Sequence, residues 1–157
     1  MIREAGLDHM ESKKMKEREP RIKVRFAVIG EEYSKEYLSE KLNLEPSCFR
    51  TKDDWPEAIK NWPVYNPDIL DEYKPKTVWE ISTAYEESNA VEFQLKKILQ
   101  KLKGKESIIN QLSKELNLHI YFEVTIKVRG SYPEVALDKE SIKFLAKIDA
   151  DIGFGFY

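Results

Sequence analysis

The chain has 157 residues, with 26 basic and 28 acidic side chains and a formal net charge of −2. This length suits one domain with a substantial core, and an apolar content of 41% excludes a generally disordered chain. The near balance of charge argues against a nucleic-acid-binding protein, which usually has a basic excess. The single cysteine excludes an intramolecular disulfide.

Residues 1–21 hold six basic and five acidic side chains and few residues that would form a core. We expect them to be a charged, flexible N-terminal extension. They lack the apolar stretch of a secretory signal, and no apolar run in the chain approaches the length of a membrane-spanning helix. We therefore expect a cytoplasmic protein that does not associate with a membrane.

The folded part is predicted to begin with a strand, a short helix and a second short strand. Apolar residues at alternate positions of 22–29 indicate a half-buried strand. Ser34 is suited to cap the N-terminus of a helix, and Asn43 is suited to end it. Residues 47–53 are then expected to form a short strand.

A long irregular loop is predicted over residues 54–76. Four prolines interrupt this segment and each removes a backbone hydrogen-bond donor. Because the loop also carries two tryptophans and two tyrosines, we expect it to be packed rather than disordered. A helical turn is predicted near 56–61.

The remaining elements are predicted from the periods of their apolar residues. Asn89, with Glu92 three positions later, resembles a capping box at the start of a helix. In chain order, the elements are strand 78–83, helix 91–102, helix 108–116, strand 118–128, a hairpin strand within 132–137, a helix that Asp138 caps, and strand 152–156.

Strands with a period of two have one polar face, which is typical of antiparallel or mixed sheets. Helices gathered on the other face give a two-layer sandwich. Residues 22–157 are therefore predicted to form a single α+β domain, with a ferredoxin-like arrangement and additional strands.

The segment KVRFAVIGEEYSKEYLSEKLNLEPS resembles the opening of the DUF4279 family, a bacterial family of unassigned function. The resemblance covers about residues 22–157 and also includes the helix VEFQLKKILQKL and a C-terminal strand–helix–strand unit. It implies a fold rather than an activity, and some such small proteins lie beside toxins as immunity-type proteins. The residues that carry it are Gly30, Leu42, Leu44, Pro46 and Trp79.

The predicted strand 118–128 places His119, Tyr121 and Glu123 on one face. Such a set can supply an acid, a base and an orienting group, but a solvated outer face is the favoured interpretation. Cys48 has no matched histidine base and is expected to be a small core residue. The chain has no cysteine cluster, paired helical histidines or calcium-binding loop. We therefore predict no catalytic residue, metal site or cofactor.

Residues 53–87 are acidic and aromatic, with nine acidic and three basic side chains and all three tryptophans. Aromatic residues surrounded by charge of one sign are typical of hot spots that bind an oppositely charged partner. Alternatively, Trp79 packs in the core while Trp55 and Trp62 hold the loop in place. The candidate partner-binding residues are Trp55, Trp62, Tyr65, Asp68, Asp71, Glu72 and Tyr73.

Two functional hypotheses follow. The preferred one is a non-catalytic binding module, an immunity-type or regulatory protein that docks a basic protein partner through the acidic aromatic loop. The alternative is a small-molecule-binding protein or enzyme with a pocket between the loop and the sheet. Its candidate groups are His119, Tyr121, Glu123, Trp55 and Trp62. Neither a nucleic-acid partner nor a particular oligomeric state is predicted.

Overall fold

The computed structural model describes residues 19–68, 70 and 74–157. Its described part contains a six-stranded mixed sheet with the strand order β2-β3-β1-β5-β6, and β4 also pairs with β1. β5 and β6 are parallel, and every other pairing is antiparallel. The strands are β1 (Arg21–Gly30), β2 (Cys48–Arg50), β3 (Thr77–Ser82), β4 (Glu86–Glu87), β5 (His119–Lys127) and β6 (Asp151–Phe156).

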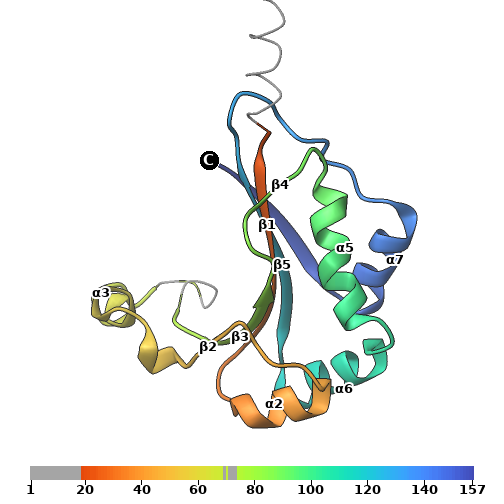
Figure 1. Cartoon of the computed structure of the whole chain (residues 1–157). Coiled ribbons are helices and arrows are strands. Elements are labelled where there is room, and N and C mark those ends of the chain that lie inside the picture. Colours follow the sequence, from red (N-terminus) through yellow and green to blue (C-terminus); the bar gives the residue numbers. More distant parts are fainter. Residues whose placement is uncertain (1–18, 69, 71–73) are drawn as a thin grey trace, which may run out of the picture.

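One layer of helices packs against one face of this sheet. Figure 1 shows α5 and α7 on that side, whereas α3 projects on the other side of the strands. The helices of the layer are α2 (Lys35–Leu42), α5 (Val91–Leu102), α6 (Glu106–Leu116) and α7 (Lys139–Lys147). The predicted α+β class is therefore confirmed, while the ferredoxin-like detail is not confirmed by this strand order.

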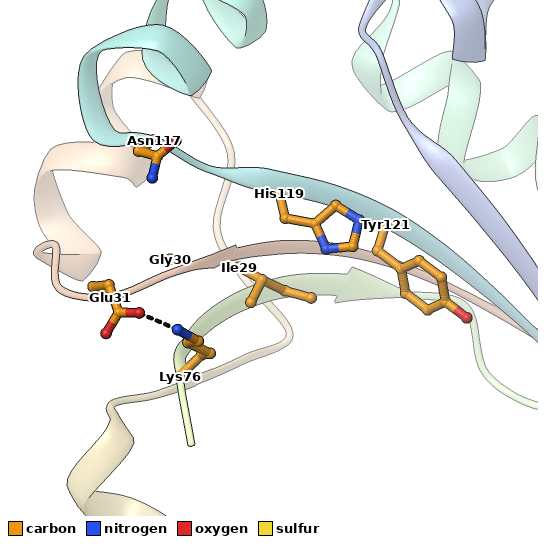
Figure 2. Close-up of a pocket in the computed structure, with 7 residues that line it drawn as sticks. All are labelled: Ile29, Gly30, Glu31, Lys76, Asn117, His119 and Tyr121. Atoms are coloured by element: carbon orange, nitrogen blue, oxygen red, sulfur yellow. Dashed lines mark hydrogen bonds and ion pairs between the residues drawn. The ribbon is translucent and has the colours of Figure 1, made fainter. Parts of the chain in front are cut away.

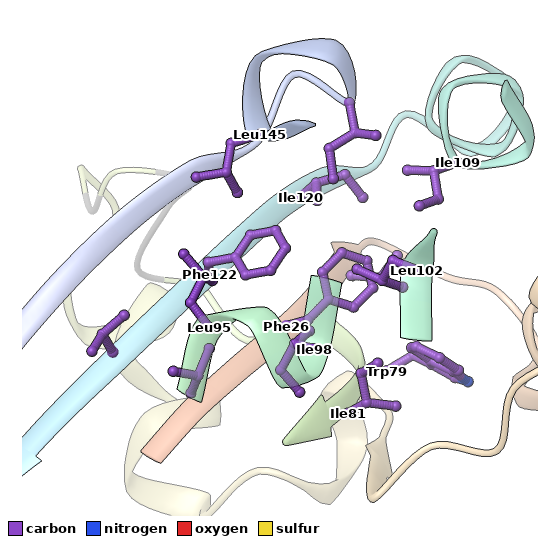
Figure 3. Close-up of a cluster of buried hydrophobic side chains, with 14 of the residues drawn as sticks. Phe26, Trp79, Ile81, Leu95, Ile98, Leu102, Ile109, Ile120, Phe122 and Leu145 are labelled. Atoms are coloured by element: carbon purple, nitrogen blue, oxygen red, sulfur yellow. The ribbon is translucent and has the colours of Figure 1, made fainter. Parts of the chain in front are cut away.

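The core lies between the sheet and the helical layer. Alternate residues of β1 and β5 are buried, as the period of two predicts. Phe26 is central, because its ring centroid lies 6.4 Å from that of Trp79 and 5.1 Å from that of Phe122. Figure 3 shows these rings among aliphatic side chains from the covering helices. The expectation that Trp79 is a core residue is thus confirmed.

Local capping signals position two helices of the layer. The hydroxyl oxygen of Ser34 accepts a hydrogen bond from the Tyr37 N–H at 3.0 Å, which caps α2. Asn43 ends α2 in the left-handed conformation, with a φ of 53°. Asp138 caps α7 by accepting the Ser141 N–H at 2.8 Å. Both predicted caps and the predicted stop are confirmed.

The predicted hairpin strand within 132–137 is wrong. Both edges of β5 are already occupied, by β1 on one side and β6 on the other, so no edge is left for a hairpin partner. The segment instead passes the start of α5, where Glu134 forms an isolated parallel bridge with Ala90. The Val91 N–H donates to the Glu134 carbonyl at 3.0 Å.

The capping box predicted at Asn89 and Glu92 is also wrong. The N-cap position of α5 is Ala90, which has no capping side chain. The Glu92 carboxylate turns to the start of α7, where it accepts the Ser141 hydroxyl at 2.5 Å and the Asp138 N–H at 3.2 Å. The expectation that Cys48 is a small core residue is a third one that the structure contradicts, because Cys48 is exposed.

The segment between β2 and β3 leaves the body of the domain. It contains the short helical elements η1 (Lys52–Asp54), α3 (Glu57–Lys60) and α4 (Trp62–Tyr65). α3 falls where a helical turn was predicted. We call the described residues 51–68, 70 and 74–76 the excursion.

At the other end of the domain, the Ser88 N–H donates to the Pro20 carbonyl at 3.0 Å. Residues 1–18 of the predicted extension lie outside the described residues.

Candidate functional site

Trp55 holds the two ends of the excursion together. Its indole N–H donates to the Lys76 carbonyl at 2.7 Å, and the Arg50 guanidinium lies over its ring, 4.2 Å from the centroid. The side chain is half-buried. Trp55 therefore anchors the excursion, as the alternative interpretation of this tryptophan expects.

Trp62 and Tyr65 behave differently, since they face solvent from α4. Trp62 is 45% exposed and Tyr65 is 75% exposed. Together with Asn66, Pro67 and Asp68 they line a hollow of about 520 Å³, which we call the aromatic hollow. Tyr65 and Trp62 lie three positions apart on α4, which brings their side chains to one side of this short helix. Three further candidates, Asp71, Glu72 and Tyr73, lie outside the described residues.

The fold spreads the negative charge of residues 53–87. Of the seven acidic residues of this segment that the structure describes, three form ion pairs with basic residues from other parts of the chain, which offsets part of the negative charge. The pairs are Glu80–Arg25 at 2.5 Å, Glu87–Arg129 at 3.0 Å, and Glu86–Lys97. Asp68, by contrast, is exposed in the aromatic hollow.

A second concave region lies on the sheet face that the helices leave open. The open-face cavity has a volume of about 430 Å³ and lies where β1 and β5 meet the end of the excursion. Figure 2 shows His119 and Tyr121 on β5, Ile29 on β1, and the ion pair that joins Lys76 to Glu31. The residues that line the cavity are Ile29, Gly30, Glu31, Lys76, Asn117, His119 and Tyr121.

His119 has an acidic neighbour on the next strand. Its Nε2 atom lies 2.7 Å from the Asp151 carboxylate, and both side chains are more than half exposed. Its ring centroid is 5.9 Å from that of Tyr121. The contact with Asp151 therefore orients the His119 imidazole at the cavity without burying it. In this orientation the other ring nitrogen can bind a ligand.

Glu123 does not join this group. It lies opposite Arg25 in the β1–β5 register, and its carboxylate is 3.4 Å from the guanidinium. Burial opposes the charge of Arg25, but hydrogen bonds and charge interactions with Glu80 and Glu123 raise the pKa of the guanidinium above its ordinary value. Of the three residues predicted as a set, the structure brings His119 and Tyr121 to the cavity and assigns Glu123 to an ion-pair network.

Comparison with protein families gives one match. A family model described as "Domain of unknown function (DUF4279)" matches residues 20–157. The chain belongs to this family. No curated protein and no solved structure gave a significant match.

In this DUF4279 domain, sequence reasoning missed Glu31, Lys76, Asn117 and Asp151 as residues of the cavity region. No motif links them, because they come from four separated segments. Asp151 reaches this region through strand pairing, since Tyr121 lies opposite Asp151 in the parallel β5–β6 register.

The part of the DUF4279 domain that the structure describes was compared with the requirements of a metal site and of a membrane-spanning helix, and it meets neither. Within residues 19–68, 70 and 74–157, no three His, Cys, Asp or Glu side chains gather as a metal ion would require. Among the same residues, no helix combines the length and hydropathy needed to cross a membrane.

Proposed function

We propose that this protein is a non-catalytic binding module, which docks a basic protein partner through the aromatic hollow. The observation that carries the proposal is the exposure of Trp62 and Tyr65 beside the carboxylate of Asp68, on an excursion that projects from the domain. An immunity-type or regulatory role in the bacterial cytoplasm belongs to the same proposal. No nucleic acid or membrane is assigned to this surface.

The chemistry of the aromatic hollow favours a lysine or arginine side chain of the partner. A cation over the face of an aromatic ring gains about 0.5–1 kcal/mol at an exposed site and about 2 kcal/mol once water is excluded. Asp68 supplies a counter-charge at the same place, and it is the charged residue among the described residues that line the hollow. Aromatic anchors of this kind often dominate the binding energy of an interface.

The test is crosslinking mass spectrometry on partners captured by the full chain. Captured proteins should be crosslinked to the excursion, and the paired substitution Trp62→Ala with Tyr65→Ala should reduce capture of a given partner at least tenfold. Asp68→Lys should act in the same direction by repelling a basic side chain.

A matched control removes exposed aromatic residues elsewhere. Phe93 and Tyr132 are 65% and 76% exposed and lie outside the excursion. Replacing both by alanine should leave capture unchanged. If the same partners bind equally well after the Trp62 and Tyr65 substitutions, and their crosslinks avoid the excursion, the docking proposal is wrong.

A second candidate function is supported by the open-face cavity. It is small-molecule binding between the excursion and the sheet, and the observation that favours it is the convergence of His119, Tyr121 and Lys76 on a cavity of about 430 Å³. This volume is within the range of ligand sites. A metabolite that binds the native state raises the unfolding temperature. His119→Ala should abolish that rise, whereas a rise that persists would exclude this cavity.

A further inference from the structure

The outer edge of β6 lies at the opposite end of the sheet from the start of the excursion. In the strand order β2-β3-β1-β5-β6, β6 pairs with β5 on one side and with no strand of the described residues on the other. The opposite end of the sheet is β2, which has three residues and leads into the excursion. β6 has six residues and therefore offers the longer edge for pairing with another strand.

The backbone groups on this edge have no hydrogen-bond partner within the described part of the chain. The Tyr157 N–H donates to the Ile126 carbonyl and the Tyr157 carbonyl accepts the Val128 N–H, each at 2.9 Å, so both groups of Tyr157 face β5. Successive residues of a strand alternate in the direction of these groups. The residues whose N–H and C=O groups point away from β5 are therefore Ile152, Phe154 and Phe156.

β6 lacks the features that usually protect an edge strand. Such strands often carry lysine, proline or a bulge, each of which prevents pairing with another chain. After Asp151, β6 has the sequence IGFGF without charge or proline, and its register with β5 is unbroken. Phe154 and Phe156 are exposed, and the Tyr132 ring extends this apolar surface, 6.4 Å from the ring of Phe156. The edge is therefore suited to pairing with another strand.

The order of residues along β6 fits a second copy of the same strand. Apolar residues stand at 152, 154 and 156 and glycines at 153 and 155, so the pattern reads alike in both directions about Phe154. Antiparallel pairing about a two-fold axis at Phe154 places Phe154 opposite its own copy and Ile152 opposite Phe156. Each glycine then faces a glycine. The apolar residues are those with outward backbone groups, so they form the hydrogen-bonded pairs of the new ladder.

Charges on the open face of the sheet are complementary in the same register. Asp151 would lie opposite Tyr157 of the second copy, and Lys127 of that copy would follow on the next strand. All three side chains are on the same face of the sheet, because they stand at alternate positions from Tyr121. Two strand spacings separate the Cα atoms of Asp151 and Lys127 by about 10 Å, which the two side chains together can span.

Both charges are available for such a contact. The Lys127 ammonium lies 4.1 Å from the centroid of the Tyr85 ring, and no carboxylate of the described residues pairs with it. The Asp151 side chain is 73% exposed. Its neighbour His119 is charged only when protonated, so a neutral imidazole leaves the charge of the carboxylate in place. The axis repeats the contact, so the interface would contain it twice.

We infer that β6 forms the interface of a symmetric homodimer, in which residues 152–156 of two copies pair antiparallel. The occupant is a second copy because the order of the apolar residues and the positions of the two charges fit one register. The contact area is small, so the dissociation constant is expected in the micromolar range. Both excursions lie at the outer ends of the combined sheet, and the inference is therefore independent of partner docking through the aromatic hollow.

The first experiment is sedimentation equilibrium of the full chain, from micromolar to millimolar concentration. It should show a monomer–dimer equilibrium. Phe154→Lys places like charges opposite each other at the axis and should weaken the dimer at least about tenfold. The matched control is Phe93→Lys, which changes an exposed aromatic residue of α5 and should leave the equilibrium unchanged. Circular dichroism verifies that both variants are folded.

A charge exchange at exposed positions provides a test that does not depend on the folding of Phe154→Lys. Asp151→Lys should weaken the dimer about threefold, and adding Lys127→Glu should restore it. Within one copy, Asp151 lies opposite Tyr121, and Lys127 is six residues further along β5. This separation is about 20 Å, so the restoration reports a contact between copies.

Disulfide crosslinking tests the position of the axis. With Cys48→Ser in the background, Phe154→Cys should give a covalent dimer under mild oxidation, because opposite residues of a hydrogen-bonded pair have Cα atoms about 5.5 Å apart. Phe93→Cys should give none. A chain that stays monomeric up to millimolar concentration would overturn the inference, and so would a dimer that neither Phe154→Lys nor the charge exchange affects. A monomeric chain that pairs β6 with a strand of another protein would also overturn it.

Discussion

The hydroxyl oxygen of Tyr121 occupies the space that a β-carbon would fill at Gly153. An ideal β-carbon built on Gly153 would lie 2.0 Å from that oxygen, which is far inside van der Waals contact. The two residues come from neighbouring parallel strands, and Tyr121 reaches across β6 because glycine leaves the surface of that strand open. Gly153 therefore sets the position of a tyrosine that lines the open-face cavity.

Gly153→Ala should displace the Tyr121 side chain. Because the clash involves the far end of a side chain that can rotate, we expect a modest loss of stability, about 0.5–2 kcal/mol, with a clear change at the cavity. The measurement is denaturant unfolding, together with the aromatic NMR signals of Tyr121. Unchanged signals would contradict the proposed packing.

The control is the double substitution Tyr121→Phe with Gly153→Ala. Removing the hydroxyl relieves the closest contact, so the two changes should be non-additive, with a coupling of about 0.5–2 kcal/mol. Gly155→Ala is a second control, since its nearest contact is a ring carbon of Tyr157 at 3.2 Å. That change should leave Tyr121 in place.

Replacing Trp79 should reduce the stability of the domain much more than replacing Trp62. Trp79 is fully buried and its indole N–H donates to the Ser39 hydroxyl at 3.0 Å. Trp79→Ala should cost about 3–5 kcal/mol through loss of burial and the cavity that remains. Trp62→Ala should stay within about 1 kcal/mol because that ring is largely exposed. Urea unfolding followed by circular dichroism measures both, and similar losses for the two variants would contradict the packing described.

Asp138 should contribute stability that depends on pH. Hydrogen bonds from Lys96 and from the Ser141 N–H lower the pKa of this carboxyl from 3.8 to about 2. The contribution is therefore complete above the unfolded value of 3.8 and is lost as the pH falls towards about 2. Asp138→Asn keeps an oxygen that can accept the Ser141 N–H but removes the charge.

The difference in unfolding free energy between the unaltered chain and Asp138→Asn should thus shrink over this acidic range. High salt should reduce the same difference at neutral pH, because the ion pair with Lys96 is exposed to solvent. A difference that stays constant from neutral to strongly acidic pH would refute the assignment.

Trp55→Phe should loosen the excursion without unfolding the domain. Phenylalanine keeps a ring beneath Arg50 but cannot donate to the Lys76 carbonyl. Losing one hydrogen bond worth about 1 kcal/mol should accelerate local opening about fivefold. Limited proteolysis with chymotrypsin, which cleaves after aromatic residues, measures this rate. Trp62→Phe is the control and should leave both the cleavage rate and the unfolding temperature unchanged.

Periodic segments were predictable because local and tertiary preferences agree there. The alternation in β1 and β5 and the caps at Ser34 and Asp138 all match the structure. The capping box at Asn89 failed because Glu92 gains partners from α7, which lies far along the chain. The hairpin within 132–137 failed because strand order decides which edges are free, and strand order is a property of the whole sheet.

The sequence by itself determined the α+β class and the buried faces of the main strands, and it left the loop tryptophans open between anchoring and partner contact. These follow from apolar period and residue type, which act over a few neighbouring residues. Only the tertiary structure decided the charge pattern and the site. A window that is strongly acidic in sequence shares its carboxylates with distant arginines and lysines. Such sharing depends on strand pairing, because charges interact across space and not along the chain.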